Sequence, residues 1–330
     1  MIDENSNSNL IRWGIIGCGN VTEVKSGPAY QKVEGFQLAA VMRRNLEKAQ
    51  DYAKRHGVER FYSKAEDIIN NDAIDAVYIA TPPDSHKHYA LKVAAAGKPC
   101  CIEKPLSPNY PDSLAIYEAF KDQNLPLFVA YYRRSLPRFN LIKTWLENDE
   151  IGAIRHIRWH LSKPASQVDL SRQYNWRTDT EIASGGYFDD LASHGLDLFT
   201  YLLGNIQQAQ GISINQQSLY SAKDAVAANW LHKSGATGTG SWNFGCSGRE
   251  DNVEIFGSKG KIEFSVFDEE PLVLKNNNGE RSLFVKHPEN IQLYHVQDMR
   301  DQLLGNKRHP SDGLSATHTS WFMDKILGKI

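Results

Sequence analysis

Long apolar runs and a charge excess of either sign are both missing from this 330-residue sequence. No uninterrupted apolar run approaches the roughly 20 residues that a membrane-spanning helix needs. The 37 basic and 39 acidic side chains leave a formal net charge of -2, so no basic excess is available to neutralise a phosphate backbone. We therefore expect neither a membrane nor a nucleic acid as a partner, and expect a small molecule instead.

Cysteine is also scarce, and none of the four residues forms a CxxC pair: Cys18, Cys100, Cys101 and Cys246. Scattered thiols in a chain of this length are typical of a reducing compartment rather than of a disulfide framework. The polar start of the chain has no basic segment ahead of an apolar stretch, as a secretory signal has. We therefore predict a cytoplasmic protein.

Neither a fixed-period repeat nor a low-complexity tract occurs in the sequence. Hydrophobic residues make up 41% and charged residues 23% of the chain, which is ordinary for soluble globular proteins. The length accommodates two domains. We expect residues 1–9 to form a disordered tail, residues 10–129 a first domain and residues 130–330 a second.

The first domain alternates short apolar runs with helical patterns. We predict strands over 11–16, 36–42, 76–80, 99–102 and 127–131, and helices over 46–55, 86–96 and 110–122. This alternation predicts parallel βαβ units covered on both faces, a doubly wound α/β domain of the Rossmann type.

The second domain has a different pattern, in which short connections with glycine or asparagine separate several strands. We predict strands over 154–161, 225–231, 236–244, 252–256 and 261–266, and helices over 139–147, 187–203, 292–304 and 311–327. Such connections are typical of antiparallel sheets. The second domain is therefore predicted to be α+β.

A glycine turn follows the first predicted strand. Gly17 and Gly19 take the first two positions of a dinucleotide-binding turn, and Thr22 stands at the third glycine position. A pyrophosphate needs a tight turn with little side-chain bulk, so that the N–H groups of the next helix, starting at Asn20 and Val21, can bind it. Because the turn opens a βαβ series, we predict cofactor binding rather than a purely structural role.

The end of the second strand determines which dinucleotide is preferred. Arg43 and Arg44 stand there, and no carboxylate occurs until Glu47. Arginine accommodates the 2′-phosphate of NADP, whereas a carboxylate accepts hydrogen bonds from the ribose of NAD. We favour NADP, with NAD as the alternative; solvated surface charges at a strand end are the simpler structural interpretation.

Two later strand ends carry polar residues at the edge where open α/β sheets bind ligands. Glu103 and Lys104 follow one strand, and the Lys104 ammonium is suited to polarising a reacting oxygen. Another strand is followed by Thr81, Pro82 and His86, which we expect to line the nicotinamide side of a cleft. The alternatives are an ordinary surface lysine and a proline-rich turn that starts a helix.

A third candidate lies on the predicted helix 187–203. Asp190, His194, Asp197 and Tyr201 follow 4, 3 and 4 spacing, which places them on one helix face. His194 is a candidate proton donor and acceptor, with Asp190 tuning or orienting it. A structural hydrogen bond is the commoner role of such a pair.

These motifs, in this order, resemble the Gfo/Idh/MocA family of oxidoreductases over nearly the whole chain. The motifs that carry the resemblance are Gly17-Cys18-Gly19, Thr81-Pro82-Pro83 with His86, Ala96-Gly97-Lys98-Pro99 before Glu103-Lys104-Pro105, Gly185-Gly186 before Asp190 and His194, Tyr132-Arg133-Arg134 with Pro137, Ile151-Gly152, and Trp176-Arg177. The resemblance implies a large open sheet in the second domain, commonly used for oligomerisation, and hence a homo-oligomer such as a dimer or tetramer. It also implies a catalytic set of Lys104, Asp190 and His194.

The expected activity is hydride transfer between a nicotinamide cofactor and a sugar, polyol or related cyclic alcohol. We expect Arg134, Trp176 and Arg177 to approach the hydroxyl groups of the substrate. Two alternatives are an NAD-retaining glycoside hydrolase and a non-catalytic NAD(P)-sensing regulator on the same scaffold. No set of residues has the spacing of a recognised metal site, so we expect no metal.

Overall fold

The computed structural model describes residues 10–330, which form two compact units. The first unit comprises residues 10–107, 111–135 and 288–316, and the second comprises 108–110, 136–287 and 317–330. The tail predicted for residues 1–9 lies outside the described residues.

The first unit contains a six-stranded parallel sheet with the strand order β3-β2-β1-β4-β5-β6. Its strands are β1 (Ile11–Ile16), β2 (Phe36–Met42), β3 (Arg60–Tyr62), β4 (Ala76–Ile79), β5 (Cys100–Ile102) and β6 (Leu127–Val129). Its helices are α1 (Asn20–Val24), α2 (Gly27–Lys32), α3 (Leu46–His56), α4 (Glu66–Ile69), α5 (His86–Ala95), α6 (Tyr110–Asp122) and α10 (Leu293–Leu303). This is the strand order of the dinucleotide-binding doubly wound fold, and the prediction of a Rossmann domain is confirmed.

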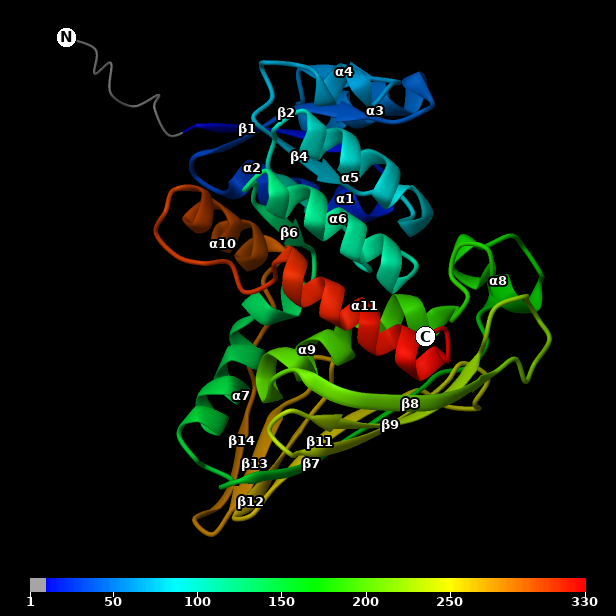
Figure 1. Cartoon of the computed structure of the whole chain (residues 1–330), viewed down its shortest axis with the longest axis vertical. Helices are drawn as coiled ribbons and strands as arrows, with labels where there is room; N and C mark the ends of the chain where they lie inside the picture. Colours follow the sequence, from blue (N-terminus) through cyan, green and yellow to red (C-terminus); the bar gives the residue numbers. More distant parts are fainter. Residues whose placement is uncertain (1–9) are drawn as a thin grey trace. The chain divides into compact units, whose positions relative to one another are not determined.

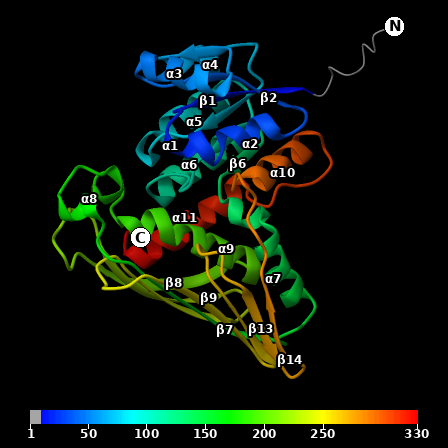
Figure 2. The same cartoon turned by 180° about the vertical axis from the view of Figure 1, so that it is seen from behind.

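Helices cover both faces of this sheet because the strands are apolar on both sides. Within β4, Val77 and Ile79 belong to the core under α4, α5 and α6, whereas Ala76 and Tyr78 belong to the core under α2 and α3. The opposite views in Figures 1 and 2 show α5 and α6 on one face and α2 on the other. Continuous burial of this kind is typical of parallel strands.

The first unit also contains a late segment that the sequence analysis assigned to the second domain. Helix α10 buries Val296 and Met299 in the core that holds Trp13 and Tyr30 of the first unit. Residues 288–316 therefore lie with the first unit because these apolar side chains complete one face of its core.

The second unit contains an eight-stranded sheet in which every neighbouring pair is antiparallel except β7 and β10. Its strands are β7 (Ile154–Ser162), β8 (Ile206–Ile214), β9 (Ala225–His232), β10 (Thr237–Asn243), β11 (Glu250–Gly257), β12 (Gly260–Phe264), β13 (Leu272–Asn276) and β14 (Gly279–Leu283). Its helices are α7 (Pro137–Glu147), α8 (Gln167–Leu170) and α9 (Ser193–Leu203), and residues 317–327 of α11 (Gly313–Leu327) also belong to it. The predicted mostly antiparallel sheet is confirmed.

Helix α9 packs against one face of the second sheet, as Figures 1 and 2 show. The absence of a side chain at Gly195 makes this approach possible, since a Cβ there would lie 2.4 Å from the ring of Trp159. The ring of Trp159 also meets Phe199 and Trp242 edge-on. A π-helical turn, Phe188–Ala192, precedes α9, so the predicted single helix over 187–203 is in fact two elements.

No helix in residues 10–330 combines the length and the apolar character needed to cross a membrane.

Candidate functional site

The glycine turn between β1 and α1 has the shape that its sequence predicts. Gly17 has a φ of 95°, and a Cβ there would lie 2.7 Å from Cγ2 of Thr81. A Cβ at Gly19 would meet only the carbonyl oxygen of Gly17, at 3.8 Å. Position 17 therefore requires glycine, because its φ is positive and a Cβ there would clash with Thr81. At position 19, the absence of a side chain leaves open space beside the backbone. This space suits the close approach of a pyrophosphate.

Thr22 replaces the third glycine without disturbing the turn. Its hydroxyl accepts a hydrogen bond from the Gly19 N–H at 3.0 Å and donates to the Gly19 carbonyl at 2.8 Å. The N–H groups of Thr22 and Glu23 also donate to that carbonyl. Within the described chain, this leaves the N–H groups of Asn20 and Val21 as the first-turn donors for an anion. The donor set fits a dinucleotide phosphate.

Arg43 and Arg44 lie at the carboxyl end of β2, as predicted. The N–H of Arg43 donates to the carbonyl of Tyr62 at 3.1 Å, and its side chain is half-buried, whereas Arg44 is exposed. Neither guanidinium forms an ion pair within residues 10–330. The charge of Arg43 acts on the Cys18 thiol of the glycine turn, although burial dominates and raises the pKa of Cys18 to about 11.

His86 joins the two polar strand ends of the first unit. Its Nε2 lies 2.8 Å from the carbonyl of Thr81, and its Nδ1 lies 3.1 Å from the carbonyl of Pro105. The ring is fully buried, and this burial lowers its pKa. With no exposed surface, His86 is placed to hold the Thr81 turn against the Glu103–Pro105 segment, rather than to touch a cofactor as we predicted.

Glu103 is held by a hydrogen-bond network that local sequence patterns do not predict. Its Oε1 accepts hydrogen bonds from the Tyr78 hydroxyl at 2.6 Å and from Nε2 of Gln292 at 2.9 Å. Its Oε2 accepts the Lys104 N–H at 3.2 Å. The Tyr78 hydroxyl also lies 3.1 Å from Oγ of Ser26. Burial and the nearby carboxylate of Glu103 raise the pKa of Tyr78, so Tyr78 stays a hydrogen-bond donor.

The second unit brings three of the predicted residues together. Nε of Arg177 donates to Oδ2 of Asp190 at 3.0 Å, and the Arg177 guanidinium stacks 4.3 Å from the centre of the Trp176 ring. His194 is buried on α9, with its ring edge-on to Phe267 at 6.0 Å between centroids. The sequence motifs 176–177 and 190–194 therefore belong to one unit of the structure.

The stripe of Asp190, His194, Asp197 and Tyr201 predicted on helix 187–203 does not lie on one α-helix. Its first member, Asp190, lies in the π-helical turn, where the spacing of an α-helix does not apply. Asp197 is fully buried and accepts a hydrogen bond from the Thr319 hydroxyl at 3.0 Å. The Tyr201 hydroxyl donates to Asn140 at 2.9 Å. Asp197 and Tyr201 therefore each form a hydrogen bond within the second unit.

Comparison with known proteins identifies the family. Residues 11–131 match a model described as "Oxidoreductase family, NAD-binding Rossmann fold", and residues 139–263 match the "GFO/IDH/MocA C-terminal domain". The chain belongs to the Gfo/Idh/MocA family of oxidoreductases. It is therefore an NAD(P)-dependent oxidoreductase, and the resemblance noted in the sequence is confirmed.

Relatives within the Gfo/Idh/MocA family cover most of the chain. It is 38% identical over 319 residues to Oxidoreductase P35 of Formosa agariphila, which covers 96% of this chain and 98% of the relative. It is 27% identical to the myo-inositol 2-dehydrogenase of Thermotoga maritima, covering 82% and 80% of the two chains. A solved levoglucosan dehydrogenase in complex with NADH shares the fold, with a TM-score of 0.87, 24% identity and coverage of 96% and 95%.

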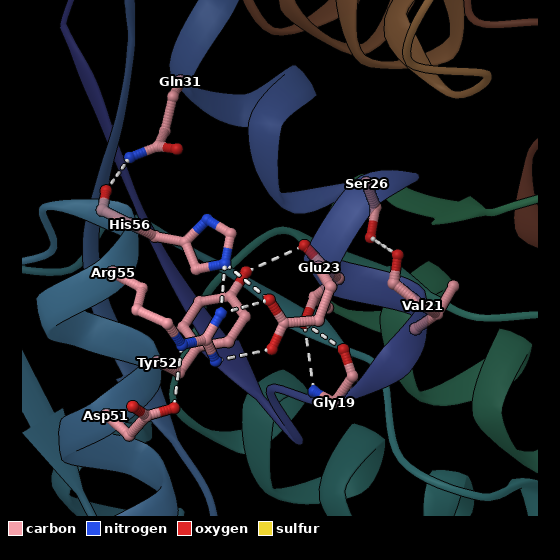
Figure 3. Close-up of polar contacts among 10 residues, drawn as sticks. Gly19, Val21, Glu23, Ser26, Gln31, Asp51, Tyr52, Arg55 and His56 are labelled. Carbon is pink, nitrogen blue, oxygen red and sulfur yellow. Dashed lines mark hydrogen bonds and ion pairs between the residues drawn. The ribbon is translucent and has the colours of Figure 1, made fainter.

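An ion-pair cluster that the sequence analysis missed fixes the first helix of this Gfo/Idh/MocA protein. Figure 3 shows Glu23 of α1 facing Arg55 and His56 at the end of α3. Both Glu23 carboxylate oxygens accept from Arg55, at 2.7 and 2.8 Å, and Nε2 of His56 lies 2.7 Å from Oε2. The Tyr52 hydroxyl donates to the carbonyl of Thr22 at 2.9 Å. An acidic residue in the first turn of α1 was the available sequence signal.

We expect Glu23→Gln to lower the melting temperature by about 2–4 °C at pH 7, a typical effect of losing one partly exposed ion pair. Arg55, with a smaller contribution from His56, lowers the pKa of Glu23 to about 2. The stabilisation is present above the ordinary carboxyl pKa and is lost as the pH falls through the folded value. The melting-temperature difference from the wild type should therefore shrink from pH 5 towards pH 2.

The matched control is Glu289→Gln, which removes the exposed ion pair between Lys32 and Glu289 in the same unit. We expect this control to leave the melting temperature nearly unchanged at every pH. A pH-independent loss in Glu23→Gln, equal at pH 7 and pH 3, would contradict the assignment of the effect to the Glu23 charge.

Proposed function

We propose that this protein oxidises a secondary hydroxyl group of a sugar or polyol, or carries out the reverse reduction, with Lys104 and His194 acting on the same substrate oxygen. The names of its relatives, myo-inositol 2-dehydrogenase and levoglucosan dehydrogenase, support a polyhydroxylated substrate. The observation that carries the proposal is the buried network that fixes the Glu103–Lys104 segment at the carboxyl end of β5, where open parallel sheets bind ligands.

When bound, a nicotinamide cofactor would supply or accept the hydride, while the side chains of the protein transfer the proton and stabilise the charge on the oxygen. His194 removes the hydroxyl proton during oxidation and returns it during reduction. The ammonium of Lys104 donates a hydrogen bond to the same oxygen and stabilises the negative charge that develops on it. Asp190, already paired with Arg177, helps to orient the substrate and His194. We propose Arg134, Trp176 and Arg177 as contacts for further hydroxyl groups.

A panel of sugars, inositols, diols and sugar acids, each incubated with NAD⁺ and with NADP⁺, tests this function directly. The expected result is substrate-dependent formation of reduced nicotinamide, which is measured from its absorbance. Cofactor that binds but never reacts across the whole panel would overturn the proposal and favour a sensing or NAD-retaining hydrolytic role.

We further propose that NADP is the preferred cofactor. Arg43 and Arg44 form no ion pair within the described residues and stand where the 2′-phosphate binds in doubly wound folds. In the double variant Arg43→Gln/Arg44→Gln, the KM for NADP⁺ should rise about 10- to 100-fold, the range that a hydrogen bond between charged groups supplies. The KM for NAD⁺ serves as the internal control and should change less than threefold; equal losses for both cofactors would contradict the preference.

The homo-oligomer and the cytoplasmic location expected from the sequence stay predictions.

A further inference from the structure

Lys163 is a half-buried cation in the second unit that the proposed function has not used. It directly follows β7, and its backbone N–H donates to the carbonyl of Asn243 on β10 at 3.0 Å. Its Nζ lies 4.0 Å from the centre of the Tyr187 ring. The base of the side chain is therefore fixed by the sheet, and its ammonium rests on an aromatic surface next to the π-helical turn.

The neighbouring carboxylates already have other partners. Asp169 accepts hydrogen bonds from the N–H and hydroxyl of Ser166, at 3.0 and 2.6 Å, and from the hydroxyl of Tyr187, at 2.8 Å. Asp190 accepts from Arg177. The two carboxylates act on Lys163 only at longer range, and within residues 10–330 Lys163 forms no ion pair.

The other charges that face Lys163 are cations. Arg177 and Arg249 oppose its charge, and Arg249 is itself paired with Asp268 at 2.8 Å. Burial, which outweighs the nearby carboxylates, lowers the pKa of the Lys163 ammonium. The aromatic ring and the more distant carboxylates therefore compensate for only part of the lost hydration of this cation, and an anionic group of a ligand would compensate for the rest.

The surroundings of Lys163 suit a sugar ring that bears such a group. The Tyr187 hydroxyl accepts a hydrogen bond from Asn175 at 3.2 Å, so the Trp176–Arg177 segment that follows Asn175 starts beside the ring on which Lys163 rests. Asp190, paired with Arg177, offers acceptor atoms for hydroxyl groups. Asp190 also electrostatically influences Lys163 and lies four residues before His194 in the chain. Cation, aromatic surface and hydroxyl-binding carboxylate thus come from one unit.

We propose that Lys163 binds a carboxylate of the substrate, so that the preferred substrates are sugar acids rather than neutral sugars. The assignment rests on the proposed function, because it names the substrate class of the same site. A neutral polyol would leave the ammonium half-buried and unpaired, whereas a carboxylate provides a charge-assisted hydrogen bond.

Matched substrate pairs test the assignment: glucuronate against glucose, and gluconate against sorbitol. We expect the wild type to favour the acid of each pair at least tenfold in kcat/KM. Lys163→Gln should lose about 10- to 100-fold on the acids, mainly through KM, with little change on the neutral partners. Lys163→Arg should keep most of the preference, and the exposed control Lys233→Gln should behave like the wild type.

Two results would overturn the assignment: an equal loss on acids and neutral sugars in Lys163→Gln, or tighter binding of glucose 6-phosphate than of glucuronate. Calorimetric binding of glucuronate, measured with NADP⁺ and the turnover-deficient Lys104→Met enzyme, separates the two proposals. If glucuronate binding depends on Lys163 but the wild type does not turn glucuronate over, only the proposed oxidoreductase role is contradicted. Turnover of the sugar acids that is unchanged in Lys163→Gln would contradict only the sugar-acid assignment.

Discussion

Replacing Lys104 by methionine is expected to lower kcat about 10²- to 10³-fold, the usual effect of removing one donor that stabilises a developing oxyanion. Methionine keeps most of the volume of the side chain and removes the charge. The hydrogen bonds that hold Glu103 come from Tyr78, Gln292 and the backbone of Lys104, and all of them survive the change. The loss should therefore appear in turnover, measured with saturating cofactor and substrate.

Cofactor binding provides the control for this variant. The dissociation constant of NADPH, measured by fluorescence, should stay within a few-fold of the wild type in Lys104→Met. Lys64→Met, at an exposed position of the same unit, should leave both turnover and binding unchanged. A turnover of Lys104→Met within threefold of the wild-type value would show that Lys104 has no role in the reaction.

Replacing His194 by glycine is expected to lower kcat about 10²- to 10⁴-fold, the range attributed to general acid–base catalysis. The imidazole ring is buried on α9, so the variant leaves a cavity of matching shape. Added imidazole should restore part of the turnover if proton transfer is the role of the ring. The matched control is His160→Asn on β7, which should keep wild-type turnover. A large loss with no response to imidazole would indicate a purely structural role for His194.

The parts of the fold that the sequence predicted are those with a strong local signal. Apolar runs bounded by glycine or proline predicted the positions of β1, β2, β4, β5 and β6. The glycine turn and the Glu103–Lys104 segment directly follow two of these strands. Two of the missed strands, β3 and β14, lack this signal. Strand β3 has three residues, and every residue of β14 is exposed, so neither shows the alternation that marks a half-buried strand.

The rest of the candidate site depends on contacts between residues far apart in the chain. Gln292 reaches Glu103 across 189 positions, because α10 packs with the first unit rather than with its sequence neighbours. The π-helical turn at Asp190 changes the helix phase that the sequence spacing assumed. His86 has the residue type of a site residue, but its burial makes it a support between two loops. None of these outcomes follows from local propensity.

The central proposal is that Lys104 and His194 act on a single substrate oxygen. A crystal structure of the protein with NADP⁺ and an oxidisable sugar or sugar acid measures this directly. We predict that Nζ of Lys104 and one imidazole nitrogen of His194 both lie within about 3.5 Å of the hydroxyl oxygen on the carbon that faces the nicotinamide. A bound substrate whose reacting hydroxyl contacts neither side chain, or only one of them, would contradict the account.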